Sequence, residues 1–407
     1  MAVGSKKNDL YRKEIFKTLY FDKTASCADI SFRIGKSIPL ITKVLNELIR
    51  EGYVIETGYA SSTGGRRPQL YSLKEDIIFI VSVSIDQFMT RIAIMNFRNE
   101  LVSSIEKFDL PLYKNDASLQ ILTEKLNEVI EDSGIPKEKI AGIGISMPGF
   151  VNVNEGVNYS YLPTGNDQTI PDYVSSRTGL PVYIDNDSTL IALAELKFGS
   201  LYGKKNVMVI NIGWGIGLGL ILNGKLYRGV NGFAGELSHL PIFPNAKLCT
   251  CGKSGCLDTE AALGVIIERA VEGLKKGQLS KLSLNDFSGS IEQSSDSIIS
   301  AAKNGDMFAV KLFSEAGYSI GRGISILIHL LNPELFILAG RGAALGKIWE
   351  GPMHHSLNEH CIPSLSVNTE LKVSTLGNRA ELIGAAALVM ENYAVDNLLK
   401  SAQMANA

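Results

Sequence analysis

One histidine and three cysteines in the second half of the chain have the residue types and the spacing that suit a metal ion. They are His239, Cys249, Cys251 and Cys256. Thiolate sulfur and imidazole nitrogen are ligands that Zn²⁺ prefers, and four of them complete its tetrahedral shell. Because a complete shell leaves no place for a reactive water molecule, we expect one structural Zn²⁺ per chain. The alternative is a chance grouping of free cysteines beside a histidine.

The cysteines also bear on the compartment in which the protein works. Only five are present among 407 residues, and the N-terminal residues lack the apolar core of a secretory signal. The longest apolar stretch, Val207 to Leu222, contains Asn211 and several glycines. It therefore predicts paired strands and not a membrane span. We expect a cytoplasmic protein whose clustered cysteines bind metal instead of forming disulfides.

The first 74 residues predict three short helices followed by a hairpin. Helical spacing of apolar residues predicts a helix from Asp9 to Tyr20, and a capping box of Ser26 and Asp29 starts a second helix that ends at Gly35. A third helix begins near Ser37. Its predicted inner stripe consists of Ile38, Ile41, Leu45 and Leu48. The short turn between the last two helices is typical of a helix-turn-helix.

Positive charge accumulates on this segment, which favours binding to double-stranded DNA. Residues 1–74 contain 13 Lys and Arg against 7 Asp and Glu, a net charge of +6, so the other residues carry −8 of the total of −2. Strands at residues 53–57 and 70–73 flank a turn with two arginines that can reach phosphates or a minor groove. The residues expected to contact DNA are Lys36, Ser37, Pro39, Thr42, Lys43, Arg66 and Arg67. The alternative is a winged helix that contacts only protein, and Cys27 is expected to be a small buried residue.

The remaining residues predict two related α/β halves. Three strands are expected at residues 77–85, 91–97 and 101–108, and the pattern returns at residues 206–212, 217–222 and 225–227. Asn223-Gly224 is a hairpin signal. We therefore expect halves at residues 75–200 and 201–407 that meet at a ligand-binding cleft, with the C-terminal helix as a candidate to pack back on the first half.

Four features together point to a known family. They are an N-terminal domain that runs into GGRRP, the Asn186-Asp187 pair, the GELSH segment and the CxCGxxGC cysteine cluster. Together they resemble the ROK family (repressors, open reading frames and sugar kinases), in its repressor branch, over almost the whole chain. The resemblance implies an α/β fold in which a winged helix-turn-helix precedes a duplicated actin-like, hexokinase-type (ribonuclease H-like) body with a zinc loop.

The resemblance also implies which residues bind a sugar. Asn186 and Asp187 would hydrogen-bond sugar hydroxyls, and Asp187 matches the catalytic base of the kinases. Glu236 and His239 match residues near the anomeric end of the sugar, and Asp258 stands where the family usually has a sugar-binding glutamate. The shorter side chain of Asp258 leaves the identity of the sugar open. Without the resemblance, Asp187 and Glu236 are explained equally well as helix caps.

The segments that bind nucleotide in the kinases are altered in this chain. Ser84-Ile85-Asp86-Gln87-Phe88 stands in place of a DxGGT loop, Trp214 replaces a threonine, and the third segment remains only as Ala339-Gly340-Arg341-Gly342. A phenylalanine and a carboxylate do not cradle a triphosphate. We therefore expect no enzymatic activity, with Asp187 retained as a vestigial base.

The expected function is that of a sugar-responsive transcription regulator, a repressor by its family branch. Its partners would be operator DNA and a sugar or sugar phosphate. We expect a homodimer or homotetramer, because two-fold symmetry doubles the DNA site that one helix reads. Two alternatives stay open: an ATP-dependent sugar kinase of the ROK family with a DNA-binding head, and a body that binds another protein.

Overall fold

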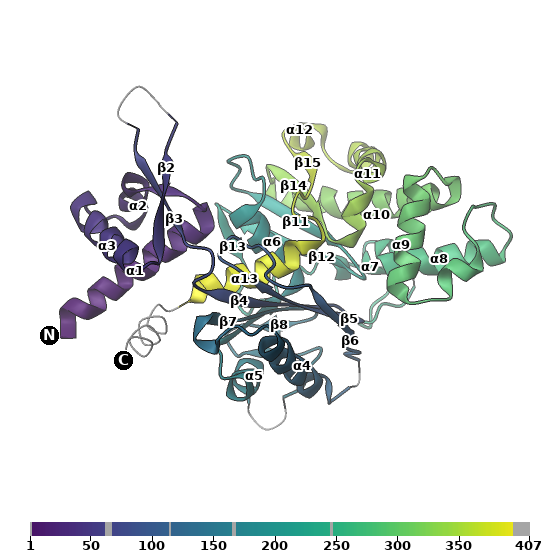
Figure 1. The fold of residues 1–407 in the computed structure, drawn as a ribbon. Coiled ribbons are helices and arrows are strands. Elements are labelled where there is room, and N and C mark those ends of the chain that lie inside the picture. Colours follow the sequence, from purple (N-terminus) through teal and green to yellow (C-terminus); the bar gives the residue numbers. More distant parts are fainter. Residues whose placement is uncertain (1, 62–66, 114, 165–167, 245–246, 394–407) are drawn as a thin grey trace. The chain divides into compact units, whose positions relative to one another are not determined.

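A computed structural model describes residues 2–61, 67–113, 115–164, 168–244 and 247–393 (Figure 1). The chain forms two compact units. The first contains the residues up to Asp185 together with those from Leu382 onward, and the second contains Asn186–Glu381. The boundaries predicted at residues 74 and 200 remain predictions. Each helix that the structure describes is too short or too polar to cross a membrane.

Three helices and a three-stranded sheet make up the N-terminal part of the first unit (Figure 1). The helices are α1 (Ala2–Asp22), α2 (Cys27–Ile34) and α3 (Ile38–Arg50), and the strands are β1 (Ala25–Ser26), β2 (Val54–Tyr59) and β3 (Gln69–Leu73). The strands lie in the order β1-β3-β2. The hairpin β2–β3 contains an irregularity between Glu56 and Gly58.

Local sequence signals explain the ends of the second helix. The Ser26 side chain accepts a hydrogen bond from the Asp29 backbone N–H, and the Asp29 carboxylate accepts one from the Ser26 backbone in return. This exchange also lowers the pKa of Asp29, because the bonds from Ser26 favour the charged carboxylate. Gly35 ends the helix in the left-handed conformation at φ 66°, which a residue with a side chain rarely adopts. The predicted capping box and helix stop are confirmed.

The buried stripe of α3 differs from the prediction at its first residue. Ile41, Val44, Leu45 and Leu48 are buried, whereas the side chain of Ile38 is 53% exposed. Spacing alone extends the stripe to Ile38. However, the first turn of a helix has no preceding turn of its own to cover it, so burial there depends on neighbouring elements. The prediction for Ile38 is therefore wrong.

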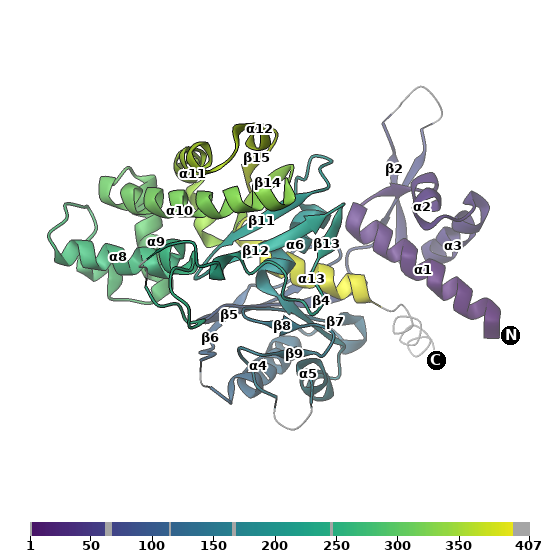
Figure 2. The same cartoon turned by 180° about the vertical axis from the view of Figure 1, so that it is seen from behind.

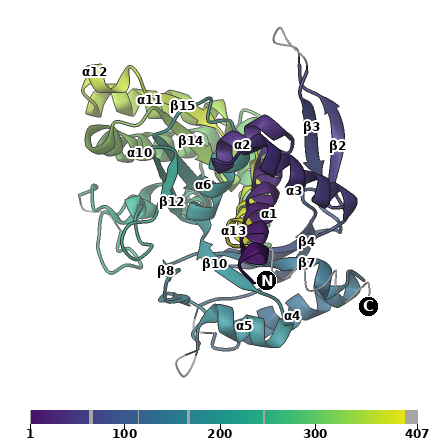
Figure 3. The same ribbon diagram turned by 90° about the vertical axis from the view of Figure 1, so that its left-hand side faces the viewer.

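A five-stranded sheet with helices on both faces forms the rest of the first unit. Its strands are β4 (Phe79–Ile85), β5 (Met89–Met95), β6 (Glu106–Asp109), β7 (Ile140–Met147) and β10 (Val182–Asn186), and its helices are α4 (Ser118–Asp132), α5 (Ile170–Thr178) and α13 (Ala380–Asn392). Figure 3 shows α4 and α5 on one face of this sheet and α13 on the other. The strands β8 (Val151–Asn152) and β9 (Val157–Asn158) form a separate pair. The strand predicted at residues 101–108 is shorter than expected, because Leu101 makes only an isolated bridge to Met95.

The second unit is built around another five-stranded sheet. Its strands are β11 (Val207–Ile212), β12 (Ile216–Leu222), β13 (Lys225–Tyr227), β14 (Leu335–Ala339) and β15 (Glu370–Val373). Its helices are α6 (Asp187–Phe198), α7 (Asp258–Ala261), α8 (Leu263–Lys275), α9 (Ile291–Lys303), α10 (Met307–Leu331), α11 (Lys347–His360) and α12 (Pro363–Ser366). Along β11, Met208 and Ile210 face the core with α8 to α11, while Val207 and Val209 face the core with α6. Figure 2 shows α10 and α11 on one face of the sheet and α6 on the other.

The two sheets repeat one topology. Their orders are β10-β7-β4-β5-β6 and β13-β12-β11-β14-β15. When the strands of each sheet are numbered in chain order, the first sheet read from β6 to β10 and the second read from β13 to β15 both follow 3-2-1-4-5. In each sheet the second strand runs antiparallel to the first and the fourth runs parallel to it. This identity of order and direction agrees with the duplicated pattern of strands in the sequence.

Aromatic residues join α1 to the turn after β5 in the first unit. Phe16 and Tyr20 are buried, and their rings lie 6.3 and 5.9 Å from the ring of Phe97. The Tyr20 hydroxyl donates a hydrogen bond to Oδ1 of Asn99. Complete burial raises the pKa of Tyr20 well above its usual range, so the phenol stays neutral and remains a donor. The N-terminal helices are thus fixed to the adjacent sheet by packing and by one partly buried hydrogen bond.

We expect Tyr20→Phe to lower the free energy of unfolding by about 0.5–1.5 kcal/mol, because it removes the hydrogen bond to the partly buried Asn99 side chain. Chemical denaturation monitored by fluorescence would measure this change. Tyr59→Phe is the matched control, since Tyr59 is 65% exposed. Equal stability of the Tyr20 variant and the wild type would remove this hydrogen bond from the contacts that hold α1.

Candidate functional site

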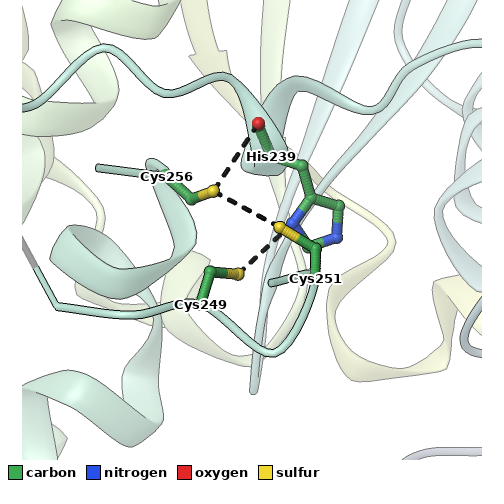
Figure 4. Close-up of side chains that lie close together, drawn as sticks. All are labelled: His239, Cys249, Cys251 and Cys256. Atoms are coloured by element: carbon green, nitrogen blue, oxygen red, sulfur yellow. Dashed lines mark hydrogen bonds between the residues drawn. The ribbon is translucent and has the colours of Figure 1, made fainter. Parts of the chain in front are cut away.

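The four predicted metal ligands converge in the second unit (Figure 4). Nδ1 of His239 lies 3.5 Å from Sγ of Cys249, and Sγ of Cys251 lies 3.6 Å from Sγ of Cys256. Zn–S bonds of about 2.3 Å and Zn–N bonds of about 2.0–2.1 Å in a tetrahedron require S···S near about 3.8 Å and S···N near about 3.5 Å. These two separations are close to the tetrahedral values, and all four donor atoms lie within 4.8 Å of one another, so the donor set could hold a tetrahedral ion.

A tight loop holds the cysteines in this arrangement. Isolated bridges pair Leu248 with Ser254 and Pro241 with Cys256. Gly255 adopts φ 82°, and a Cβ atom at this position would lie 2.1 Å from the Phe243 carbonyl oxygen. A glycine is required here, because any side chain would push the Cys256 end of the loop away from the other ligands.

Burial and hydrogen bonding shift the pKa values of two of the thiols in opposite directions. Burial raises the pKa of the Cys256 thiol to about 12, whereas a backbone hydrogen bond from Lys253 lowers the pKa of Cys251. A buried thiol with so high a pKa is neutral at pH 7. Since a bound divalent cation favours the thiolate, metal binding would release protons from this cluster.

His239 has its second ring nitrogen directed to another candidate residue. Its Nε2 lies 3.9 Å from Oε2 of Glu236, which is longer than a hydrogen bond. Partial removal of water raises the pKa of Glu236, and the neighbouring His239 opposes that rise. Glu236 makes no side-chain capping bond to the short helix that follows it, so capping does not explain this residue. One imidazole thus has Nδ1 among the sulfur atoms and Nε2 beside a carboxylate.

Asp258 connects the cysteine loop to the start of β12. It is the first residue of α7, two positions after Cys256, and its Oδ1 accepts a hydrogen bond of 2.9 Å from the Ile216 backbone N–H. Burial raises the pKa of Asp258, while this bond opposes the rise. The position of the cysteine loop is therefore tied to the strand.

Asn186 and Asp187 begin α6. Asn186 is the capping residue, since its Oδ1 accepts hydrogen bonds from the backbone N–H groups of Ser188 and Thr189. Oδ1 of Asp187 lies 2.6 Å from the Ser188 nitrogen. Both residues therefore help to begin helix α6, whether or not they also contact a ligand.

Asn211 belongs to this region although the sequence analysis did not assign it a role. Its side chain is buried and donates a hydrogen bond of 3.1 Å to Oγ of Ser188. A Cβ atom at Gly217 would lie 1.8 Å from the same Ser188 oxygen, so β12 must have glycine there. The signal in the sequence is a single amide within an otherwise apolar strand.

The five predicted sugar contacts thus lie around the first half of β12. α6 approaches the strand at Gly217, Asp258 binds Ile216, and Gly235, next to Glu236, would place a Cβ atom 2.3 Å from the Leu218 carbonyl oxygen. All of them belong to the second unit. The strand therefore positions side chains that are far apart in the sequence.

The structure also places most of the residues predicted to contact DNA. Ser37, Pro39, Lys43 and Arg67 are exposed, while Arg66 lies outside the described residues. The Lys36 ammonium group lies 5.8 Å from the centre of the Tyr11 ring. Oγ1 of the exposed Thr42 lies 3.2 Å from Sγ of Cys27. Cys27 is partly exposed, so its predicted burial is wrong, because it lies at the contact between α2 and α3 and not in the core.

Internal contacts occupy the altered nucleotide segments. In the first unit, Oδ1 of Asp86 accepts hydrogen bonds of 2.8 Å from the backbone N–H groups of Phe88 and Met89. In the second unit, the Arg341 guanidinium lies 5.4 Å from the Trp214 ring centre and donates to carboxylates of Glu292 and Asp296 on α9. The sequence analysis did not predict these ion pairs. The backbone N–H groups of Phe88 and Met89 and the Arg341 guanidinium, which are groups that could bind phosphate, thus already have carboxylate partners.

Comparison with known proteins agrees with this description. The model of the ROK family matches residues 90–392. The xylose repressor of Caldicellulosiruptor bescii is 29% identical over 93% of this chain and 94% of that protein. The glucokinase of Halalkalibacterium halodurans is 31% identical over 76% of this chain and 94% of that protein.

A solved structure is similar over almost the full length. It is the crystal structure of a ROK family transcriptional regulator, a homolog of the E. coli MLC protein, with a TM-score of 0.76, 26% identity, and coverage of 97% of this chain and 98% of that chain. The family model by itself spans well over half of the residues. The resemblance noted in the sequence is thus confirmed, and this chain belongs to the ROK family.

Proposed function

We propose that this chain is a sugar-responsive transcriptional repressor. The observation that carries the proposal is the extent of the matches. The xylose repressor and the ROK regulator structure match 93% and 97% of this chain, whereas the glucokinase matches 76%. Matches of this length extend into the N-terminal helices and hairpin as well as the body. In this proposal residues 1–74 form a winged helix-turn-helix that binds operator DNA.

The body binds a sugar or sugar phosphate through Asn186, Asp187, Glu236, His239 and Asp258. These residues supply carboxylate, amide and imidazole groups, which suit the hydroxyl groups of a sugar. Their common position around β12 supports this assignment. A pentose such as xylose is the first ligand to test, followed by glucose and the phosphates of both.

The histidine and cysteine cluster binds one structural Zn²⁺. The tetrahedral separations and the all-thiolate and imidazole donor set support zinc. When bound, the ion supplies a fixed, water-free anchor for the loop. Nδ1 of His239 would bind the ion together with the cysteines. Nε2, on the other side of the same ring, faces Glu236.

Operator binding in the presence and absence of sugars tests the function as a whole. Duplexes selected from a random library by the full-length protein would be titrated by fluorescence anisotropy, with each sugar added in turn. The proposal expects a selected sequence to bind and one sugar to weaken that binding. Selective DNA binding that no sugar or sugar phosphate changes would favour the alternative of a protein partner.

We expect no sugar-dependent ADP production with ATP, Mg²⁺ and the same sugars. Phosphoryl transfer depends on groups positioned around the phosphates, and here Asp86 and Arg341 have internal partners. A coupled assay would measure ADP, with a ROK glucokinase as the positive control. Sugar-dependent ADP that disappears in Asp187→Asn would establish the kinase alternative instead.

We expect Arg66→Ala combined with Arg67→Ala to weaken DNA binding and to reduce its dependence on salt. Each lost phosphate contact lowers the slope of log K against log salt by about 0.9, so the double variant loses up to about 1.8. Anisotropy titrations at several salt concentrations give the slope. Lys303→Ala, an exposed charge in the second unit, is the control. An unchanged slope would exclude the arginines of the hairpin from the DNA interface.

A further inference from the structure

Ile38 is an exposed aliphatic side chain at the first position of α3. The other large aliphatic residues of this helix are buried or partly buried, and Ile38 alone has an exposed fraction above one third, at 53%. The helical spacing of Ile38 with Ile41, Leu45 and Leu48 predicts that it points inward. Its outward position places a branched hydrocarbon at the end of the helix that is assigned to reading DNA.

The backbone that carries Ile38 is fixed. Sγ of Cys27 lies 3.8 Å from the Ile38 carbonyl oxygen and 3.2 Å from Oγ1 of Thr42. The backbone N–H groups of Leu40 and Ile41 both donate to the Ser37 carbonyl oxygen, and Pro39 restricts the first turn through its ring. A ligand that contacts Ile38 therefore does not have to order this backbone first, which lowers the cost of binding.

Polar and basic residues surround this hydrocarbon. Thr42 lies one helical turn after Ile38 on the same face, and Lys36, Ser37 and Lys43 are exposed nearby in sequence. Ser37 caps the helix without a side-chain capping bond. The end of α3 therefore combines one apolar group with hydroxyl and ammonium groups, which suits a surface that carries phosphates and a few methyl groups.

The major groove offers only one such apolar group. Each base pair presents hydrogen-bond donors and acceptors there, and the 5-methyl group of thymine is the single hydrocarbon. Ile38 has no side-chain donor or acceptor. The attractive contact by which it can distinguish base pairs is therefore packing against this methyl group.

We propose that Ile38 reads a thymine in each half of the operator by contact with its 5-methyl group. This inference rests on the proposed function, because it assumes that α3 enters the major groove. It goes further by assigning one base to one residue. The recognition helices of a symmetric dimer would place the two thymines in equivalent positions of the two half-sites.

Deoxyuridine tests the contact, because it lacks only the methyl group. Each thymine of a selected operator would be replaced in turn, in both half-sites together, and the affinity of the full-length protein measured by anisotropy. For the wild type we expect one symmetric pair of replacements to weaken binding by about fourfold per methyl group, the effect of exposing one buried hydrocarbon group of that size. Other thymines should have smaller effects.

Ile38→Ala should bind the thymine operator more weakly and should no longer distinguish uracil from thymine at that pair of positions. Leu10→Ala is the matched control, since Leu10 is 54% exposed on α1; it should bind like the wild type and keep the full uracil effect. Because Ile38 is exposed, circular dichroism of the alanine variant should match the wild type.

Two results would overturn the inference while leaving DNA binding intact. One is a wild type that binds a selected operator and is indifferent to every uracil replacement. The other is an Ile38→Ala variant with the same uracil effect as the wild type. If sedimentation also shows that this variant self-associates more weakly, Ile38 contacts another copy of the chain and not a thymine. A wild type that selects no DNA sequence at all would instead contradict the proposed function.

Discussion

Replacing Cys256 by serine should remove most of the bound zinc and destabilise the second unit. Cys256 is fully buried, and its sulfur lies 3.6 Å from that of Cys251. A serine hydroxyl is a poor substitute for a thiolate, because it stays protonated and bonds zinc weakly. Structural zinc provides about 10–16 kcal/mol of folding free energy in small zinc-binding peptides. For this larger unit we expect a loss of several kcal/mol, seen as a melting temperature lower by about 10 °C or more.

Metal analysis of protein purified without chelators would measure the zinc, and calorimetry would measure the melting temperature. Cys361→Ser provides a matched control, because Cys361 is also buried but lies outside the cluster. It should keep one zinc ion per chain. Wild-type protein without metal, or an equal loss of metal from both variants, would contradict the assignment of the ligands.

The sugar response should disappear in Asp187→Ala. A ligand that couples to DNA binding by about 1–3 kcal/mol changes operator affinity roughly 5 to 150-fold, and this change requires that the sugar still binds. Removing the carboxylate deletes an acceptor for sugar hydroxyls. The helix itself should persist, because Asn186 and not Asp187 provides the cap of α6. Loss of a negative charge from the first turn costs only about 0.3–1 kcal/mol.

Anisotropy titrations of operator DNA across a range of sugar concentrations would show this effect. Without sugar, the affinity of the variant for DNA should equal that of the wild type, because Asp187 lies in the second unit and the N-terminal helices lie in the first. Asp132→Ala, which removes an exposed carboxylate at the end of α4, should respond to sugar normally. A wild-type midpoint in Asp187→Ala would place the sugar elsewhere.

Short-range signals in the sequence determined much of this protein. The capping box of Ser26 and Asp29, the stop at Gly35 and the hairpin at Asn223-Gly224 act within a few residues, and each appears where it was predicted. The close grouping of the three cysteines was also predictable, since they lie within eight consecutive residues, whereas the approach of His239 to them depends on the fold. The repeated pattern of strands in the sequence predicted two related halves, and the two sheets share one topology.

Tertiary structure decided the features that depend on distant partners. The outward direction of Ile38 depends on what α1 and α2 cover, and the partner of Asn211 is a serine 23 positions away. The cation–π contact of Arg341 with Trp214 joins segments more than a hundred residues apart. Periodicity and local propensity contain no information about which surfaces meet, because burial and pairing are set by packing across the whole core. The candidate functional groups could therefore be identified from the sequence, whereas packing determined which of them are exposed and which have a partner within the protein.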